Sequence, residues 1–251
     1  MFTKLKITLV GILLIFGFHT KAAQNTNFTS AEEVNAKISQ GINALDRGEA
    51  KKAFRILQPL ANRQHPKALA AVGVILARDL FVDKGRKVFG NVNWSGVPSN
   101  GVKELAMLRR SAAIGSPEGK YYLGFYLVLL SSNDEKSAGW DLINESADLG
   151  FLRAQWDLHL FHLNIGDNFK IQRNRHKAIE SYSELFKWLY LYIHCKFRNP
   201  KIREFEWNDF YTVLFSDDKV ISRAEVTKMG NDHITRWKNR HGSLCINDVS
   251  K

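Results

Sequence analysis

Three stretches of this chain align with one another without gaps and carry small residues at the same places. They cover residues 60–73, 111–124 and 146–159. The second, fifth and ninth places of each stretch hold Ala61, Ala112 and Ala147, then Gln64, Gly115 and Gly150, then Ala68, Gly119 and Ala154. The alanines at the second place are separated by 51 and then by 35 residues. Repeat lengths of about 20–50 residues are typical of helical solenoids, so we expect such an array with an insertion in its first interval.

The residues around Gly115 predict a turn between two helices. Glycine suits the position just after a helix, where the backbone becomes left-handed, and Ser116 can cap the next helix. Pro117 fits the first turn of that helix, where its missing N–H costs no hydrogen bond. Apolar residues then recur at steps of three and four, which predicts an amphipathic helix. These residues are Tyr122, Phe125, Tyr126 and Leu129.

Further helix starts and close helix contacts are expected from the same reasoning. Ser30 and Ser222, each followed three residues later by glutamate, resemble capping boxes. Glycine inside a helix costs about 1 kcal/mol relative to alanine, so its presence needs a reason. We expect paired helices to approach closely at the small residues, while larger apolar side chains fill the remaining volume. In the central copy these residues are Ala112, Gly115, Gly119 and Gly124.

The central copy resembles the Sel-like repeat, a relative of the tetratricopeptide repeat (TPR). The residues that carry the resemblance are Ala112, Gly115, Gly119, Tyr122, Leu123, Gly124 and Tyr126. Residues 50–73, 177–196 and 220–241 are also similar to this family, and the resemblance covers about residues 31–241. The positions that depart from the family pattern are Gln64, Asp157 and His159.

This resemblance implies an all-α protein, folded as a right-handed α-solenoid of helix-turn-helix (Sel-like or TPR-like) repeats. We expect about four repeats plus terminal helices over residues 31–241, followed by a C-terminal tail over residues 242–251. A solenoid leaves an extended concave surface of the kind that binds proteins or peptides. Cysteine-rich secreted relatives are linked to β-lactam binding or hydrolysis, but this chain lacks the cysteine pair that those relatives carry in each repeat.

The first 22 residues have the organisation of a secretory signal peptide. A positive start, MFTKLK, precedes an apolar run over residues 7–18, and small residues stand at Thr20 and Ala22. The run is shorter than the roughly 20 residues of a membrane span, which favours cleavage after Ala22 over an uncleaved anchor. We therefore expect a periplasmic or secreted protein with a flexible leader over residues 23–30. Removal of three lysines with the signal peptide lowers the formal net charge from +11 to +8.

Export also bears on the two cysteines, Cys195 and Cys245. An oxidising compartment permits a disulfide between them, which would tie the last helices together. Spacing alone does not show that their Cα atoms come close enough, so two unpaired thiols are the alternative.

Two segments supply candidate contacts for a partner. One is an insertion rich in glycine and asparagine over residues 82–101, and the other is a basic stretch over residues 166–177. With the open face of the predicted solenoid, they give as partner-binding candidates Trp94, Phe89, Arg173, Arg175, Lys170 and Trp188. Tyr122, Tyr126 and Trp156 are further candidates, although their phase in the repeat also suits a core. The alternatives are a loop that packs its own aromatic side chains and a solvated basic face.

Residue patterns for chemistry are weak in this chain. His159 and His162 share a helix face, but Asp157 lies off it, so a metal would need a third ligand from elsewhere. A packed histidine pair is the alternative. The sequence contains no GxSxG, GxGxxG or CxxC pattern. We therefore assign no catalytic, cofactor-binding or metal-binding residue.

These observations predict a protein-binding module and not an enzyme. The basic charge favours an acidic protein partner, such as a toxin, an effector or an envelope protein. Peripheral contact with a membrane surface stays open, and export disfavours nucleic acid. Secreted Sel-like proteins of this size resemble immunity proteins, which would neutralise an antibacterial effector, for example a lipase-type one, by steric cover. The alternatives are a cell-envelope hydrolase, a penicillin-binding or β-lactamase-like enzyme, and a host-interaction factor.

Overall fold

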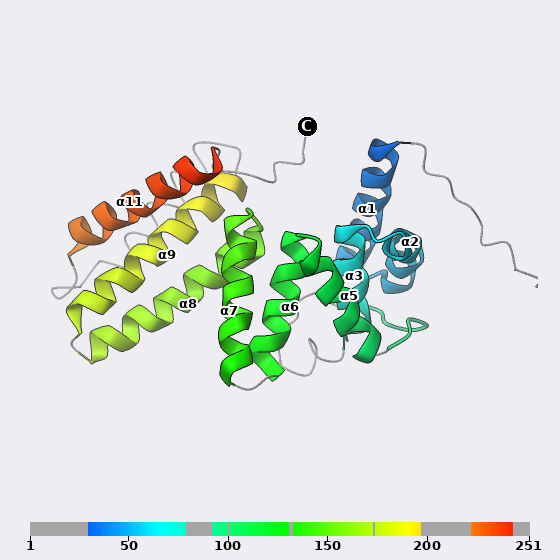
Figure 1. Cartoon of the computed structure of the whole chain (residues 1–251), viewed down its shortest axis with the longest axis horizontal. Helices are drawn as coiled ribbons and strands as arrows, with labels where there is room; N and C mark the ends of the chain where they lie inside the picture. Colours follow the sequence, from blue (N-terminus) through cyan, green and yellow to red (C-terminus); the bar gives the residue numbers. More distant parts are fainter. Residues whose placement is uncertain are drawn as a thin grey trace, which may run out of the picture.

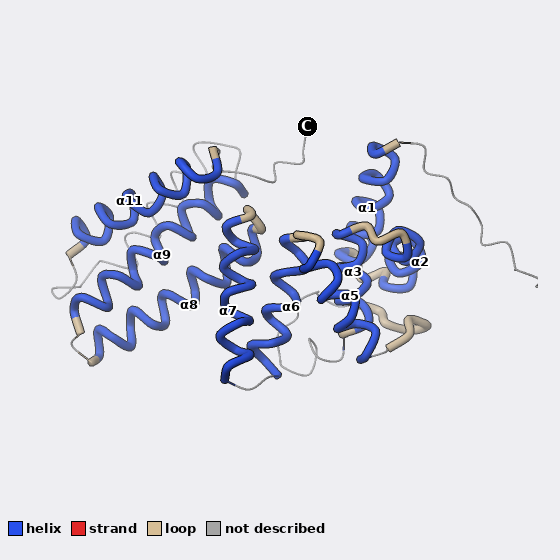
Figure 2. The backbone as a smooth tube through the Cα atoms, in the orientation of Figure 1, coloured by secondary structure: helices blue, strands red, loops and turns tan. Residues whose placement is uncertain are grey.

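The computed structural model describes residues 30–78, 92–99, 101–130, 133–172, 174–196 and 222–242. Within these ranges the chain forms α-helices and no strand, which confirms the all-α class (Figure 2). The helices are α1 (Ala31–Asp46), α2 (Ala50–Asn62), α3 (Pro66–Leu76), α5 (Gly101–Ala113), α6 (Pro117–Leu130), α7 (Asn133–Asp148), α8 (Leu152–Ile171), α9 (Arg175–Lys196) and α11 (Arg223–His241). The predicted signal peptide lies outside the described residues, as do Phe89, Arg173 and Cys245.

Helices that are neighbours in the sequence pack against one another along the molecule. Figure 1 shows α1, α2, α3 and α5 at one end, α6 and α7 in the middle, and α8, α9 and α11 at the other end. The last three run side by side, with α9 between α8 and α11. None of the described helices is long and apolar enough to cross a membrane.

Four turns between successive helices share one backbone geometry. Each contains a residue with positive φ, namely Gly48 (79°), Gln64 (63°), Gly115 (86°) and Gly150 (83°). The N–H of Gly115 donates to the carbonyl of Ala112 (3.0 Å), and the N–H of Ser116 donates to the carbonyl of Ser111 (3.1 Å). The other three turns repeat both hydrogen bonds. This is the Schellman arrangement, so the left-handed turn predicted at Gly115 is confirmed, and Gln64 adopts it without being glycine.

The predicted helix caps are also confirmed. The hydroxyl of Ser116 accepts a hydrogen bond from the Gly119 N–H (3.1 Å), and α6 begins at Pro117. Ser30 accepts from Glu33 N–H at 3.2 Å, and Ser222 accepts from Glu225 N–H at 3.4 Å. These bonds satisfy backbone donors that the first turn of each helix leaves without a helical partner.

A second recurring contact joins one helix pair to the next. Ser111 in α5 donates its hydroxyl to the carbonyl of Pro66, the first residue of α3 (2.8 Å). Ser146 in α7 donates in the same way to Pro117, the first residue of α6 (2.7 Å). Both serines are fully buried. The two serines hold the first place of their aligned stretches, so equivalent residues make equivalent contacts.

Two of the small residues of the central copy allow helices to touch. A methyl group at Gly124 in α6 would lie 2.5 Å from the carbonyl oxygen of Gly139 in α7, which is closer than such atoms can approach. One at Gly119 would lie 2.7 Å from the backbone nitrogen of Ala112 in α5. Gly115 differs, because nothing lies within 4 Å of its missing side chain. The expectation that Gly115 is a packing residue was wrong, and its role is the left-handed turn.

Helix α6 is not amphipathic in the way its spacing predicts. Tyr121, outside the predicted stripe, is 1% exposed, whereas Tyr122 and Tyr126 are only partly buried. The physical reason is that α6 contacts α3, α5 and α7 and so is covered on several sides. A helix covered in this way needs apolar residues around most of its circumference.

The contact at Gly124 predicts a measurable loss of stability in Gly124→Ala. The substitution gains about 1 kcal/mol of helix propensity, but it forces α6 and α7 apart, so we expect a net loss of about 2 kcal/mol. Thermal unfolding followed by circular dichroism measures it. Ala138→Ser, which adds one heavy atom at an exposed position of α7, is the control and should change the stability by less than about 0.5 kcal/mol. Equal midpoints for the two variants would contradict the packing role.

Candidate partner-binding surface

Large apolar side chains are exposed at few places in the described part of the chain. They are Ile114 (38% exposed), Trp156 (39%) and Leu160 (44%). Trp156 and Leu160 are one turn apart on α8, so they lie on the same face of that helix. Exposed apolar residues that cluster are a feature of interaction sites, whereas single ones are ordinary.

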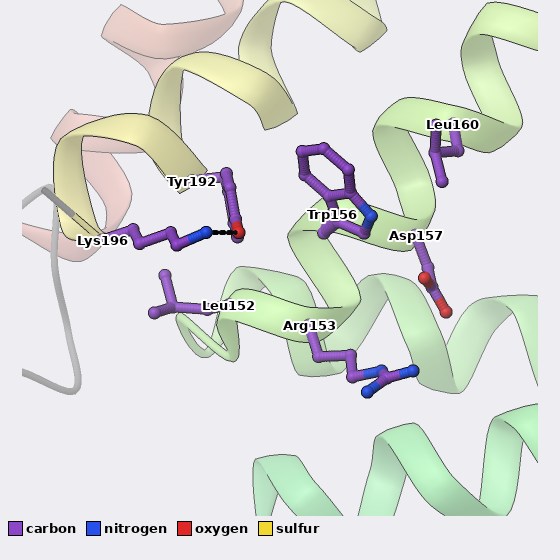
Figure 3. Close-up of a pocket in the computed structure, with 7 residues that line it drawn as sticks. All are labelled: Leu152, Arg153, Trp156, Asp157, Leu160, Tyr192 and Lys196. Carbon is purple, nitrogen blue, oxygen red and sulfur yellow. Dashed lines mark hydrogen bonds between the residues drawn. The ribbon is translucent and has the colours of Figure 1, made fainter. Parts of the chain in front are cut away.

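Trp156 and Leu160 line an open hollow of about 580 Å³ between α8 and α9 (Figure 3). Its lining residues are Leu152, Arg153, Trp156, Asp157, Leu160, Tyr192 and Lys196. The first half of α8 and the last turn of α9 meet here because the two helices pack along their lengths after a short turn. The hollow therefore combines apolar walls with two cationic side chains and one carboxylate.

A buried tyrosine holds two of the charged groups at this hollow. The Tyr121 hydroxyl donates to Asp157 Oδ2 (2.7 Å) and accepts from Arg153 Nε (3.2 Å). Burial, followed by the negative charge of Asp157, raises the pKa of Tyr121 well above its usual value of 10.0. The hydroxyl therefore keeps its proton at physiological pH and acts as a fixed hydrogen-bond donor. From its buried place in α6, this hydroxyl positions the side chains of Arg153 and Asp157 on α8.

The aromatic wall is built from both helices. The ring centroids of Trp156 and Tyr192 are 4.9 Å apart. Trp156 also contacts His159, and the centroids of these two rings are 4.1 Å apart. Lys196 Nζ donates to the Tyr192 hydroxyl (2.6 Å). Figure 3 shows this bond to the left of Trp156, with Arg153 below the indole and Asp157 to its lower right. Tryptophan, tyrosine and arginine are enriched among the residues that dominate binding energy at interfaces.

The alignment of the repeats explains why this surface is open. Trp156 holds the same place in its stretch as Ala70 and Tyr121, which are both 1% exposed. Tyr121 is covered by the next helix pair, whose Phe151 ring lies 5.2 Å away. At Trp156 the neighbour is α9, which leaves the indole partly uncovered. The hollow thus lies beside Trp156 of the third aligned stretch, which is less well covered than Tyr121 of the second stretch.

The residues chosen from the sequence do not gather at one site. Trp94 is partly buried against the core of α1, α2 and α3. Lys170 lies in the last turn of α8, and the exposed Arg175 forms an ion pair with Glu225 of α11. Trp188 is 2% exposed and packs with Trp237 in the core, so the expectation that it contacts a partner is corrected. The position of Trp94 fits the alternative for residues 82–101, in which the inserted loop packs its own aromatic side chains.

Sequence reasoning missed most of the hollow. The repeat phase of Trp156 favours a core position, and Lys196 is notable in the sequence only as part of a basic cluster. No sequence pattern points to Arg153, Leu160 or Tyr192. A signal was present at Asp157, which replaces an aromatic residue of the repeat pattern beside Trp156. A charged residue at that place indicates that this copy is not covered like the others.

The other residues weighed for chemistry have structural surroundings. His159 is buried, and burial lowers the pKa of both His159 and His162 to about 4. Among the described residues no group of three or more histidine, cysteine, aspartate or glutamate side chains could hold a metal. Cys195 is disulfide-bonded, and its predicted pairing with Cys245 falls outside the described residues.

Comparison with protein-family models, curated proteins and solved structures found no match. The Sel-like resemblance therefore stays a prediction that rests on its own residues. The hollow has to be interpreted from its geometry and charge.

The buried histidine His159 predicts that the protein loses stability in mild acid. Its pKa is about 4 in the folded chain against 6.5 for an ordinary histidine. Below the higher value the unfolded chain takes up a proton that the folded chain does not, so the free energy of unfolding falls as the pH drops between the two values. His159 should contribute roughly 1 kcal/mol of this loss between pH 7.5 and 5.5, and His162, whose pKa is also lowered to about 4, adds to it. Urea denaturation at both pH values should show a smaller loss in His159→Gln, and equal losses in both proteins would contradict the account.

Proposed function

We propose that this chain is an exported protein-binding module that holds an acidic protein partner at the hollow between α8 and α9. The observation that carries the proposal is the exposure of Trp156 and Leu160 on one face of α8, beside Arg153 and Lys196. Interfaces commonly place aromatic anchors in a partly desolvated centre with charged groups around them.

The architecture proposed for this module is a right-handed α-solenoid of about four Sel-like repeats plus terminal helices. Three observations support it. Four turns share one hydrogen-bond pattern. Ser111 and Ser146 make the same contact to the start of a preceding helix. Consecutive helices pack against one another along the chain. In such an array the binding residues lie on an extended surface, and we propose that the hollow is part of this surface.

An acidic partner follows from charge. The chain carries a formal net charge of +11, and +8 without its first 22 residues. Arg153 and Lys196 add local positive charge at the hollow, where Asp157 is engaged by Tyr121. A complementary negative surface would speed association and favour the correct partner over others.

In its sharpest form, the proposed role is that of an immunity protein in the periplasm or outside the cell. The N-terminal segment supports export, and secreted Sel-like proteins of this size resemble immunity partners of antibacterial effectors. Neutralisation would be steric. A lipase-type effector has an apolar surface that faces the membrane, and Trp156 and Leu160 would cover such a surface.

A capture experiment tests the binding proposal. The mature chain from Ala23, immobilised and exposed to envelope extract in moderate salt, should retain one stoichiometric protein. Trp156→Ala with Leu160→Ala should lose it, since the two anchors are gone. Ile114→Ala is the matched control, because Ile114 is an equally exposed apolar residue away from the hollow, and it should retain the protein.

The immunity role is tested by toxicity. If the captured protein is directed to the periplasm, it should arrest growth, and co-expression of this chain should restore growth. Retention of the partner by the double variant would contradict the location of the site. The absence of any stoichiometric partner would contradict the binding proposal, and a captured protein without toxicity would contradict the immunity role alone.

A further inference from the structure

A second hollow lies beside the first along α8. Its volume is about 440 Å³, and α6, α7 and the middle of α8 line it. Its lining residues are Phe125, Val128, Leu129, Trp140, Ile143, Asp157, Leu160, Phe161, Asn164 and Ile165. The Trp140 and Phe161 rings pack with centroids 4.0 Å apart. Asp157 is the one charged residue among these side chains.

The two hollows adjoin one another along α8, and we refer to them together as the groove. Asp157 and Leu160 line both of them. Trp156 belongs to the first hollow and Asn164, eight residues further along α8, to the second. Eight residues of α-helix span about 12 Å, so one segment of a partner can reach both hollows at once.

The groove has ends of different chemistry. At the end formed with α9, Lys196 and Arg153 supply positive charge. At the end formed with α6 and α7, the lining side chains are apolar apart from Asp157 and Asn164. Asp157, at the junction, accepts from the Tyr121 hydroxyl, and Arg153 donates to the same hydroxyl, so a positive charge lies close to this carboxylate. The groove therefore distinguishes the direction of a bound segment.

We infer that this groove, within the proposed binding function, takes a single continuous segment of the partner protein. The segment carries two large apolar side chains, one for each hollow. An acidic residue stands next to the side chain that enters the hollow between α8 and α9, where it can pair with Lys196. The rise of about 12 Å along α8 from Trp156 to Asn164 corresponds to about four residues in an extended segment or about eight in a helix. A second copy of this chain is disfavoured as the occupant because both copies would bring the same positive charge to the groove.

Selection from a phage library of random peptides of about a dozen residues tests the inference on the full mature chain. The enriched peptides should carry two large apolar residues at one of the two spacings and an acidic residue on one side. Leu160→Glu places a negative charge in both hollows, so it should weaken binding of these peptides by at least about tenfold. Lys196→Gln should weaken the preference for the acidic residue, since only Arg153 then supplies positive charge at that end, and it should leave the preference for the apolar pair.

The controls are Lys37→Gln, an exposed lysine of α1, and Ile114→Ala, and both should select the same peptides as the wild type. Failure to enrich any peptide would overturn the continuous segment, while a folded partner captured from extract would still support the proposed function. Equal binding to Leu160→Glu would place the peptides elsewhere and overturn the groove. Self-association of the wild type that Leu160→Glu abolishes in sedimentation would also overturn the inference, because the occupant would then be a second copy.

Discussion

The turn with one left-handed residue is the constraint on which the rest of the described structure depends. It closes two hydrogen bonds at the end of one helix and starts the next helix within a few residues. Because four turns share this geometry, successive helices leave each turn in the same way. The buried serine bonds at Pro66 and Pro117 then hold one pair against the next, and Gly124 and Gly139 let the helix backbones meet. Regular packing in this part of the chain follows from these short-range contacts.

The binding surface arises where that regularity changes. Helices α8 and α9 contain 20 and 22 residues, whereas α5 and α6 contain 13 and 14. Trp156 is exposed at the longer pair, α8 and α9, whereas Tyr121 in α6 is buried. The two residues hold the same place in their stretches. Tyr121 still contributes, because its hydroxyl reaches Arg153 and Asp157 from the covered side. The core of one copy thus positions the polar groups of the exposed surface.

The parts of the fold that depend on neighbouring residues could be predicted from the sequence. The caps at Ser30, Ser116 and Ser222 and the turn at Gly115 follow from local backbone chemistry. The burial of aromatic residues could not be predicted, since it depends on which distant helix covers them. Trp188 is in the core because α11 brings Trp237 against it, and Trp156 is exposed because none of the described helices does the same there. Periodicity indicates which residues share a face, but not whether that face is covered.

The central claim is that a partner binds on the face of α8 that carries Trp156 and Leu160. Hydrogen–deuterium exchange of the mature chain, with and without the captured partner, tests it directly, because it reports on every helix at once. The account predicts slower exchange in α8 and in the last turns of α9 on binding, with α1, α2 and α3 unchanged. Protection confined to α1, α2 and α3, with α8 unaffected, would contradict it.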